Sequence, residues 1–274
     1  MVKKILYIFI VVLSLHSRAY ARTIPTTDIV LSPHFDDAAL PVGGMLAKST
    51  HNKIVITVFS GKPAVDQKTT WDTESGFSSS DSAVAARIQE NDAALEYLKA
   101  SYVSLDYLDM QYRTDPDTTG LQQSIEKDIE KIITEEGMEG DVHIYFPAYF
   151  GDAISHPDHV LIHNIALDMI QKKEFPNASW YMFEDMPYSY TYFKTNKTPL
   201  IEVFTSAMKG FLLQEKNIFL NKKELVDKIH SISLYPSQLE AFKANDISLQ
   251  DIKTFTRRRC TQGPCEKVYK VVLK

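Results

Sequence analysis

The sequence DIVLSPHFDD spans residues 28–37 and predicts a buried strand that ends in a polar turn. A helix is expected at residues 40–49, where Gly43-Gly44 would let it pack closely on a sheet. Residues 53–60, KIVITVFS, are the most β-rich segment of the chain and predict a central strand. These segments form a strand–helix–strand unit from which the rest of the fold can be extended.

The same alternation continues toward the C-terminus. A polar loop is expected at residues 61–80, and an apolar spacing near 3.6 residues predicts the helix that follows it. The later elements, in chain order, are helix 82–99, strand 102–105, helix 118–136, strand 142–146, helix 158–172, strand 180–183, strand 201–204, helices 222–232 and 236–242, and strand 267–273. This alternation predicts an α/β fold with a mostly parallel sheet and helices on both faces. Since no repeat or linker is visible, residues 22–274 are expected to form a single domain.

The composition is that of a globular protein rather than of a nucleic-acid binder. The 274 residues are 44% hydrophobic and 24% charged, and a chain of this length can bury a substantial core. The formal net charge of −5 offers no basic surface to a phosphate backbone. We therefore expect no nucleic-acid partner, and no feature of the sequence indicates an oligomeric state.

The first 21 residues have the pattern of a cleavable secretory signal. Lys3-Lys4 precede the apolar run Ile5–Leu15, and a polar stretch ends in Ala19-Tyr20-Ala21. A membrane anchor is the alternative, but the run is shorter than the ~20 apolar residues that a spanning helix needs. We expect cleavage near Ala21, no stable membrane anchor after it, and an exported protein that is periplasmic or secreted.

The sequence holds only two cysteines, Cys260 and Cys265. In an exported protein, such a neighbouring pair is expected to form a disulfide that closes a short loop. Two free thiols or a metal-binding pair are the alternatives, although a single Cys-x4-Cys is a weak zinc signal.

Metal-binding side chains gather in two loops at the ends of predicted parallel strands. His34 to Asp37 supply one imidazole and two carboxylates, and His156 to His159 supply two imidazoles and another carboxylate. Ligands of α/β sheets bind at the carboxyl ends of the strands, so the two loops are expected to meet. Catalytic zinc takes three such ligands and keeps one position for water, whose pKa it lowers. The two loops therefore predict a zinc-dependent hydrolase.

Each of these residues also has an ordinary structural interpretation. His34 could stabilise a turn, Asp36-Asp37 could cap the following helix, and Asp158 could interact with a helix dipole. Taken singly, those interpretations are the better ones. Two such clusters at strand ends of one sheet favour the metal site.

The segments SPHFDD at residues 32–37 and HPDH at residues 156–159 resemble the motifs of the PIG-L/LmbE-like family of zinc-dependent N-deacetylases. The resemblance extends from Asp28 to about His163, and more loosely to Phe242. It implies a Rossmann-like α/β fold, one Zn²⁺ per chain, and removal of an acetyl group from an amino-sugar substrate of the N-acetylglucosamine type.

The resemblance also assigns roles to the residues of the two motifs. It makes His34, Asp37 and His159 the zinc ligands, and Asp36 the general base that takes a proton from water. The first motif departs from its commonest form, which has Pro in place of Phe35 and Glu in place of Ala38. Neither position is a ligand or the base, so these departures concern the substrate rather than the reaction.

The remaining roles are assigned in the same way. His156 would stabilise the oxyanion and protonate the leaving amine, while Asp158 would hold an imidazole in the right tautomer. Arg87, Asp109 and Arg113 lie in segments similar to those that line the family's substrate pocket, and they are the candidate contacts to the sugar or acetyl group. For Arg87 the alternative is a pair with Glu90 on one helix face.

Two later segments, Glu184–Tyr188 and Tyr235–Gln238, resemble features of family members that act on glycans. Two rival functions stay open at this point. One is a dinuclear metallohydrolase of the β-lactamase type, whose His-x-His-x-Asp-His signature is echoed at residues 155–159, although Ile154 occupies the first histidine position. The other is a catalytically inactive relative that only binds glycans.

Overall fold

The computed structural model describes residues 25–114, 119–136, 140–151, 153–196 and 198–274. The predicted signal peptide, residues 1–21, lies outside the described residues. Within those ranges, none of the helices combines the length and the apolar character needed to cross a membrane.

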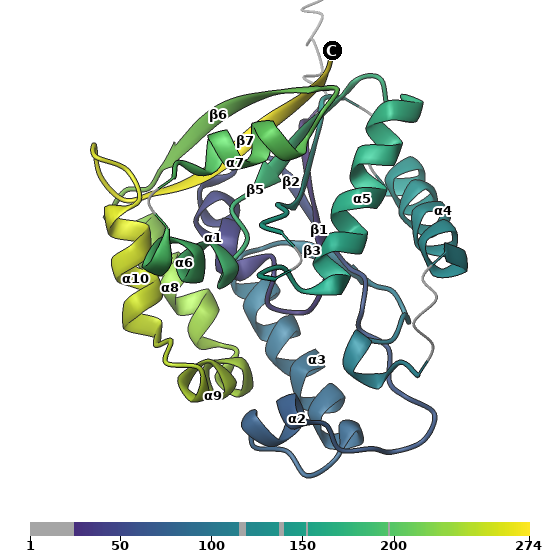
Figure 1. Cartoon of the computed structure of the whole chain (residues 1–274). Coiled ribbons are helices and arrows are strands. Elements are labelled where there is room, and N and C mark those ends of the chain that lie inside the picture. Colours follow the sequence, from purple (N-terminus) through teal and green to yellow (C-terminus); the bar gives the residue numbers. More distant parts are fainter. Residues whose placement is uncertain (1–24, 115–118, 137–139, 152, 197) are drawn as a thin grey trace, which may run out of the picture.

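The described strands form one seven-stranded sheet in the order β3-β2-β1-β4-β5-β7-β6 (Figure 1). Their bounds are β1 Thr27–Ser32, β2 Asn52–Thr57, β3 Ser101–Ser104, β4 Val142–Pro147, β5 Ala178–Phe183, β6 Phe211–Phe219 and β7 Cys265–Leu273. The first five strands of that order are parallel, and β7 is antiparallel to both of its neighbours. The predicted mostly parallel α/β sheet is confirmed.

Helices cover both faces of the sheet, as predicted (Figure 1). Their bounds are α1 Ala39–Lys48, α2 Thr70–Glu74, α3 Ser80–Tyr97, η1 Met110–Tyr112, α4 Thr119–Glu136, α5 Pro157–Lys172, α6 Tyr188–Thr195, α7 Leu200–Ala207, α8 Lys222–Ser233, α9 Pro236–Ala244 and α10 Leu249–Arg258. Alternate residues of a strand face opposite sides. Ile29 and Leu31 of β1 therefore join the core under α4, α5 and α7, whereas Val30 joins the core under α1 and α3.

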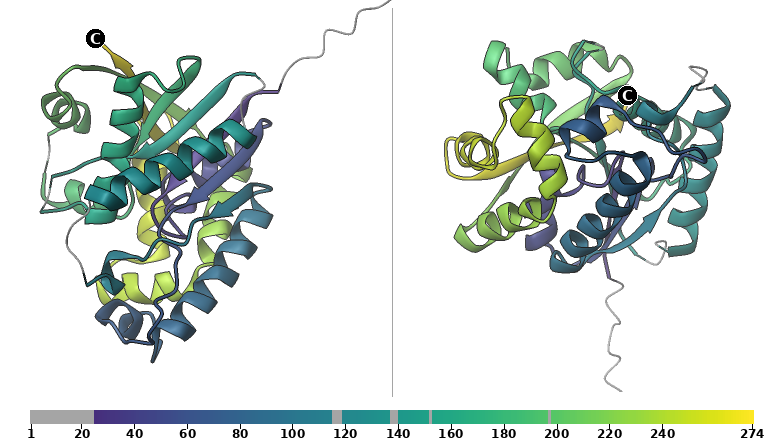
Figure 2. Two further views of the ribbon diagram at one scale, coloured as in Figure 1. Left: turned by 90° about the vertical axis from the view of Figure 1, so that its right-hand side faces the viewer. Right: turned by 90° about the horizontal axis from the view of Figure 1, so that it is seen from below.

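The C-terminal helices form a further layer behind α1 and α3. Helix α8 packs on α1 and α3, and α9 packs on α2 and α3. Figure 2 shows these yellow-green helices beside the blue helix α3. A third apolar cluster joins Phe35, Leu40, Ile232, Tyr235 and Phe242, and it connects this layer to the loop after β1.

The strand order places the two predicted loops at one point of the sheet. From β1 the chain proceeds to β2 and β3 in one direction, and from β4 to β5 in the other. A crevice opens outside the carboxyl ends of the strands at such a reversal, and ligands bind there. The loops that follow β1 and β4 border this crevice.

Several elements differ from the sequence predictions. Residues 201–204, predicted as a strand, lie in helix α7, because Leu200 and Phe204 are four residues apart and both bury into the core. The predicted loop 61–80 contains the short helix α2. Helices α6 and α10 and strand β6 were not predicted. The predicted disulfide is confirmed, because Cys260 and Cys265 are bonded at 2.00 Å.

A buried ion pair interrupts the helix that follows the first metal-binding loop. The ammonium of Lys228 donates to the carbonyls of Leu40-Pro41, and the carboxylate of Glu266 accepts from the backbone N–H groups of Gly44-Met45. In a regular helix, those carbonyls and N–H groups would bond to each other. Lys228 and Glu266 pair at 2.5 Å, and Val42, at the centre of the break, has non-helical backbone angles (φ −123°, ψ 16°). The ion pair therefore occupies the place of two helical hydrogen bonds.

We expect Gly44→Ala to destabilise the protein by about 1–3 kcal/mol, because a Cβ at this position overpacks the core. That Cβ would lie 2.5 Å from Cδ1 of Leu220 and 2.9 Å from Oε1 of Glu266. Gly43→Ala is the matched control, since its nearest contact is Oγ of Ser231 at 3.3 Å. Urea unfolding of both variants measures the difference. A Gly44→Ala protein as stable as the Gly43→Ala protein would contradict the expected clash.

Candidate active site and metal centre

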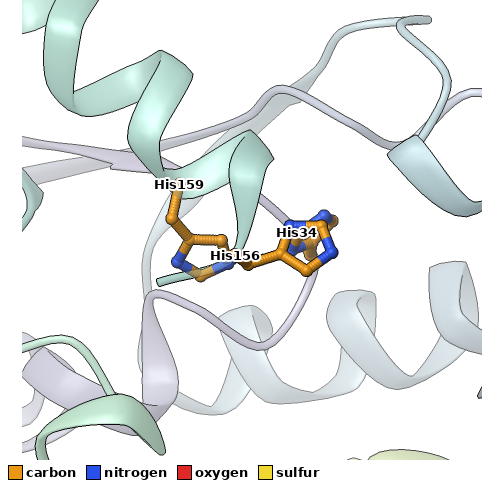
Figure 3. Close-up of side chains that lie close together, drawn as sticks. All are labelled: His34, His156 and His159. Carbon is orange, nitrogen blue, oxygen red and sulfur yellow. Dashed lines mark hydrogen bonds between the residues drawn. The ribbon is translucent and has the colours of Figure 1, made fainter. Parts of the chain in front are cut away.

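The two predicted loops meet at the carboxyl end of the sheet. His34 to Asp37 follow β1, while His156 caps α5 and His159 lies in its first turn. Figure 3 shows the imidazoles of His34, His156 and His159 gathered at the start of this helix. They line a cavity of about 520 Å³ together with Asp36 and Asp37.

Three donor atoms form a nearly equilateral triangle at the base of the cavity. Nδ1 of His34, Oδ2 of Asp37 and Nε2 of His159 lie 3.1 Å from one another. The backbone N–H of His34 also donates to Oδ2 of Asp37 at 2.7 Å, which fixes the carboxylate in the loop. These are the three residues predicted as metal ligands, and the fold brings them together.

The far nitrogen of each ligating imidazole is held by a buried carboxylate. Nδ1 of His159 lies 2.5 Å from Oδ2 of Asp185, and Nε2 of His34 lies 3.1 Å from Oδ2 of Asp158. A carboxylate at one ring nitrogen keeps the proton there. In their neutral forms, both imidazoles therefore direct a lone pair toward the carboxylate of Asp37.

Two imidazole nitrogens and a carboxylate oxygen that converge on one point require positive charge between them, supplied either by protons on the rings or by a metal ion. Donors that bind one zinc ion at about 2.0–2.2 Å lie within about 4.4 Å of each other, which the 3.1 Å triangle satisfies. Two nitrogens and one oxygen are also a ligand set that zinc accepts. The residues therefore fit a divalent metal ion.

The ionisation of the site shows the same preference for positive charge. Burial lowers the pKa of His159, but the charges of Asp185 and Asp37 outweigh burial and raise it to about 10. Burial raises the pKa of Asp37, yet the charges of His159 and His34 and the hydrogen bonds from them hold it far below its usual range. The pocket stabilises a cation beside an ionised Asp37.

Asp36 lines the cavity beside the triangle without belonging to it. Its side chain is buried, and burial together with the charge of Asp37 raises its pKa to about 7. A carboxylate with a pKa near the working pH is suited to take up and release a proton. The adjacent residues Asp36 and Asp37 thus occupy different environments, as their different predicted roles require.

His156 faces the cavity from the start of α5. Its Nδ1 accepts a hydrogen bond from the backbone N–H of Asp158 at 3.2 Å, so Nε2 carries the proton of the neutral ring. Burial and the positive charges of His34 and His159 lower its pKa to about 4. The neutral ring can therefore offer an N–H to a ligand in the cavity.

Asp158 is fully buried and collects several donors. It accepts from Nε2 of His34, from the backbone N–H of Met110 at 2.9 Å and from the guanidinium of Arg113. Burial raises its pKa, but the hydrogen bond from His34 and the nearby positive charges lower it to about 2. The imidazole that Asp158 orients is therefore that of His34.

The three candidate substrate contacts lie in different surroundings. Asp109 lines the cavity, and its Oδ1 lies 3.9 Å from Nε2 of His34. Arg87 also lines the cavity, but its guanidinium is paired with Asp72 at 3.1 Å, not with Glu90. The guanidinium of Arg113 is occupied by Asp158, by the carbonyl of Leu108 and by the ring of Phe59. For all three, contact with substrate stays a prediction.

The sequence interpretation gave no role to Asp185 and Tyr188, although it singled out the segment that contains them. Asp185 is fully buried and holds His159, while the ring of Tyr188 meets that of His159 edge-on at 5.1 Å. A carboxylate after a buried strand was the available signal. Its partner could not be identified from spacing, because 26 residues separate Asp185 from His159.

We expect Asp185→Asn to weaken metal binding by about 10- to 100-fold, the usual effect of losing a carboxylate that orients a ligating histidine. The amide cannot supply the negative charge that His159 now faces at 2.5 Å. Competition with a chromophoric chelator measures the affinity. An affinity equal to that of the wild type would show that Asp185 does not orient the ligand.

The cavity also has a largely apolar wall. Trp71, Val84, Phe242 and Ile247 line it, and the indole N–H of Trp71 donates to Oε1 of Gln238 at 3.2 Å. Most of this wall comes from α2, α9 and the residues after α9. The C-terminal layer therefore completes a cavity whose polar side comes from the loops after β1 and β4.

Solved structures with similar folds include several deacetylases. The zinc-inhibited form of a teicoplanin deacetylase is 25% identical, with a TM-score of 0.72, and the match covers 90% of this chain and 98% of that one. The deacetylase of A40926 pseudoaglycone is 24% identical at a TM-score of 0.72, covering 90% and 97%. The N,N'-diacetylchitobiose deacetylase of Pyrococcus horikoshii is 16% identical at a TM-score of 0.57, covering 90% and 84%. The last two show similarity of fold alone.

No curated protein sequence matches the chain. The model of the PIG-L family, described as GlcNAc-PI de-N-acetylase, matches residues 29–170. This region contains both metal-binding loops and makes up more than half of the chain. The protein therefore belongs to the PIG-L family and is an N-deacetylase.

Proposed function

We propose that the protein is a zinc-dependent hydrolase that removes an N-acetyl group from an amino sugar of the N-acetylglucosamine type. The observation that carries the proposal is the triangle of Nδ1 of His34, Oδ2 of Asp37 and Nε2 of His159, with Asp36 and His156 beside it in one cavity. One zinc ion in this site would serve each chain. A bound zinc ion lowers the pKa of water and polarises a carbonyl oxygen.

The protein's own residues account for the proton transfers. Asp36 takes a proton from the attacking water, whose oxygen bonds to the acetyl carbon. The N–H at Nε2 of His156 donates to the oxyanion that develops on the former carbonyl oxygen. The C–N bond then breaks and the leaving nitrogen gains a proton, for which His156 is the predicted donor. Because the ring of His156 is neutral, the proton that it gives up is replaced by the one that Asp36 took from water. The products are acetate and a free amine.

Asp158 and Asp185 act through the imidazoles they orient. Each keeps the proton on the far nitrogen of its histidine, so that the near nitrogens of His34 and His159 stay available as ligands. The charge of Arg113 compensates that of Asp158. These contacts hold the site in one arrangement before substrate arrives.

The size and lining of the cavity support a small sugar unit as the part of the substrate that binds there. Its volume of about 520 Å³ lies within the range of small-molecule sites. Asp109 is a hydrogen-bond acceptor for sugar hydroxyls, and Trp71 offers an aromatic surface to a sugar face. The similar teicoplanin and chitobiose deacetylases also bear names of sugar-containing substrates, which supports this class.

We further propose that the protein is exported, with a single mature domain starting at Arg22. The basic and apolar segments of residues 1–21 support this, and so does the disulfide between Cys260 and Cys265, because disulfides persist in oxidising compartments. The substrate would then be an extracytoplasmic glycan or glycoconjugate. N-terminal sequencing of the exported protein is expected to begin at Arg22, and an intact Met1 would contradict cleavage.

A panel of N-acetylated mono- and oligosaccharides tests the proposed activity. We expect acetate release from at least one member with zinc-loaded protein, its loss with a chelator, and its return when zinc is added. If the zinc-loaded protein released no acetate from the whole panel, the proposed substrate class would be wrong. If the protein is instead an inactive relative that only binds glycans, we expect no acetate release, together with saturable binding of a panel member.

The β-lactamase-type alternative is less compatible with the structure. That class needs a β-sandwich, whereas the described strands form a single, mostly parallel sheet. Ile154 lines the cavity where the echoed signature would place its first histidine. The parts of a mononuclear hydrolase are all present without that residue.

A further inference from the structure

A second group of potential metal ligands lies at the amino ends of the parallel strands, away from the catalytic loops. Asp28 is the second residue of β1 and is paired in register with His143 of the neighbouring strand β4, while His51 immediately precedes β2 on the other side. The catalytic loops follow the other ends of these strands. Four rises of ~3.3 Å separate Asp28 from Ser32 at the other end of β1, so this strand alone places about 13 Å between the two clusters.

The three side chains converge closely. Nδ1 of His51 lies 3.0 Å from Oδ2 of Asp28, and Nδ1 of His143 lies 3.1 Å from Oδ1 of the same carboxylate. One ligand atom from each residue lies within 4.8 Å of the others. The two imidazole rings meet edge-on with centroids 5.7 Å apart. One carboxylate is therefore held between two imidazoles, one from β4 and one from the residue before β2.

In the described part of the chain, the carboxylate of Asp28 forms no ion pair with a lysine or an arginine. The residue is 2% exposed, and in the described part of the chain its ion-pair partners are His51 and His143 alone. The ammonium of nearby Lys53 donates instead to the carbonyls of Leu46 and Leu98. Buried carboxylates are normally paired with a charge or bound to a metal. Imidazoles supply that charge only when protonated.

The cluster is also accessible from solvent. The side chains of His51 and His143 are 39% and 27% exposed, so an ion can reach the carboxylate without opening the core. The hydroxyl of Ser49 donates to Oδ2 of Asp28 at 2.5 Å and holds the carboxylate in place. The fixed, buried carboxylate of Asp28 and the two accessible imidazoles are therefore suitable ligands for a cation.

We propose that Asp28, His51 and His143 form a second zinc-binding site, distinct from the catalytic one. Two imidazole nitrogens and a carboxylate oxygen are ligands that zinc takes, with water completing the coordination. Binding displaces the Nδ1 protons that now face Asp28, and these leave to solvent. The ion would join the ends of β1, β2 and β4, three adjacent strands of the sheet. Its role is structural, and the site does not depend on the proposed deacetylation.

Asparagine substitutions separate metal binding from the hydrogen bonds. The side-chain amide of His51→Asn and His143→Asn can still donate to Asp28 in place of Nδ1–H, but it is a poor zinc ligand. Protein stripped with a chelator, equilibrated with zinc and freed of excess metal is analysed for zinc per chain. We expect two ions in the wild type, one in the His51→Asn/His143→Asn double variant, and one in Asp37→Asn.

A thermal-melting series gives an independent readout. In the Asp37→Asn background, which removes a catalytic ligand, zinc is expected to raise the melting temperature by several degrees, and the added double variant abolishes that rise. The double variant alone keeps wild-type kcat with zinc in excess. A single zinc ion in the wild type, or two in the double variant, would overturn the second site whatever the outcome of the acetate assay.

Discussion

Asp36→Ala is expected to lower kcat for deacetylation by about 100- to 10,000-fold, the usual contribution of a positioned general base. The carboxylate of Asp36 lines the cavity beside the metal-binding triangle, and no edge of that triangle involves it. Its removal therefore takes away the proton acceptor and leaves the three ligands in place. The content of bound zinc is expected to stay at the wild-type value.

Acetate release and zinc content are measured on the same samples. Asp36→Asn is the matched control for shape, because the amide keeps the volume of the side chain and cannot accept a proton from water. We expect it to be as slow as Asp36→Ala. Wild-type kcat in either variant would refute the role of Asp36, and loss of zinc would show that Asp36 is a ligand.

The second large effect is expected from the ligands themselves. Asp37→Ala and His159→Ala each remove one corner of the triangle, and we expect metal affinity to fall more than the about 100-fold that losing an orienting carboxylate can cost. Activity should fall with the metal content. Removing Asp37 also takes away a negative charge beside the buried His159, which makes the site less favourable for a cation. Added zinc is therefore expected to restore little of the activity.

Chelator competition measures these affinities, and Asp109→Asn is the control. Its carboxylate lies 3.9 Å from His34 and outside the triangle, so zinc affinity should stay close to that of the wild type. If Asp37→Ala bound zinc as tightly as Asp109→Asn did, the assigned ligand set would be wrong.

The elements that meet in the active site could be predicted from local sequence. The strand at residues 28–32 and the helix at residues 158–172 have clear apolar patterns, and the parallel topology brings the loops beside them together. The fold therefore places His34, Asp37 and His159 as the sequence suggested. His34 and His159 are 125 residues apart in the sequence, and the pairing of β1 with β4 brings them together.

The carboxylates that orient the ligands were harder to predict, because their partners depend on packing between distant segments. Asp158 was expected to hold an imidazole, and the structure identifies that ring as His34 rather than its neighbour His156. Arg113 has the length to reach a sugar, yet it binds the buried Asp158. Neither choice of partner follows from spacing.

The region after Tyr188 was the least predictable part of the fold. Strand β6 has mostly exposed residues, because it lies at the sheet edge, so its apolar alternation is weak. Residues 201–204 contain the β-branched Ile201 and Val203, which favour a strand locally. Leu200 and Phe204, one helical turn apart, both pack into the core. This tertiary packing outweighs the local preference for a strand.

The same region nevertheless shapes the active site, although the family match ends at residue 170. The hydroxyl of Tyr235 donates to the carbonyl of Phe35 at 3.0 Å, inside the first metal-binding loop. The pair of Lys228 and Glu266 fixes the helix that follows that loop. Substitutions far along the sequence can therefore alter the metal site.

The most direct test of the account is a zinc titration of chelator-treated protein with the best substrate of the saccharide panel. Acetate and free amine are quantified together, in the wild type and in Asp36→Ala. The account predicts equal amounts of acetate and amine from the wild type, no turnover before zinc is added, and a zinc-loaded Asp36→Ala protein slower by at least about 100-fold. Full turnover by the metal-free protein, or wild-type turnover by zinc-loaded Asp36→Ala, would contradict it.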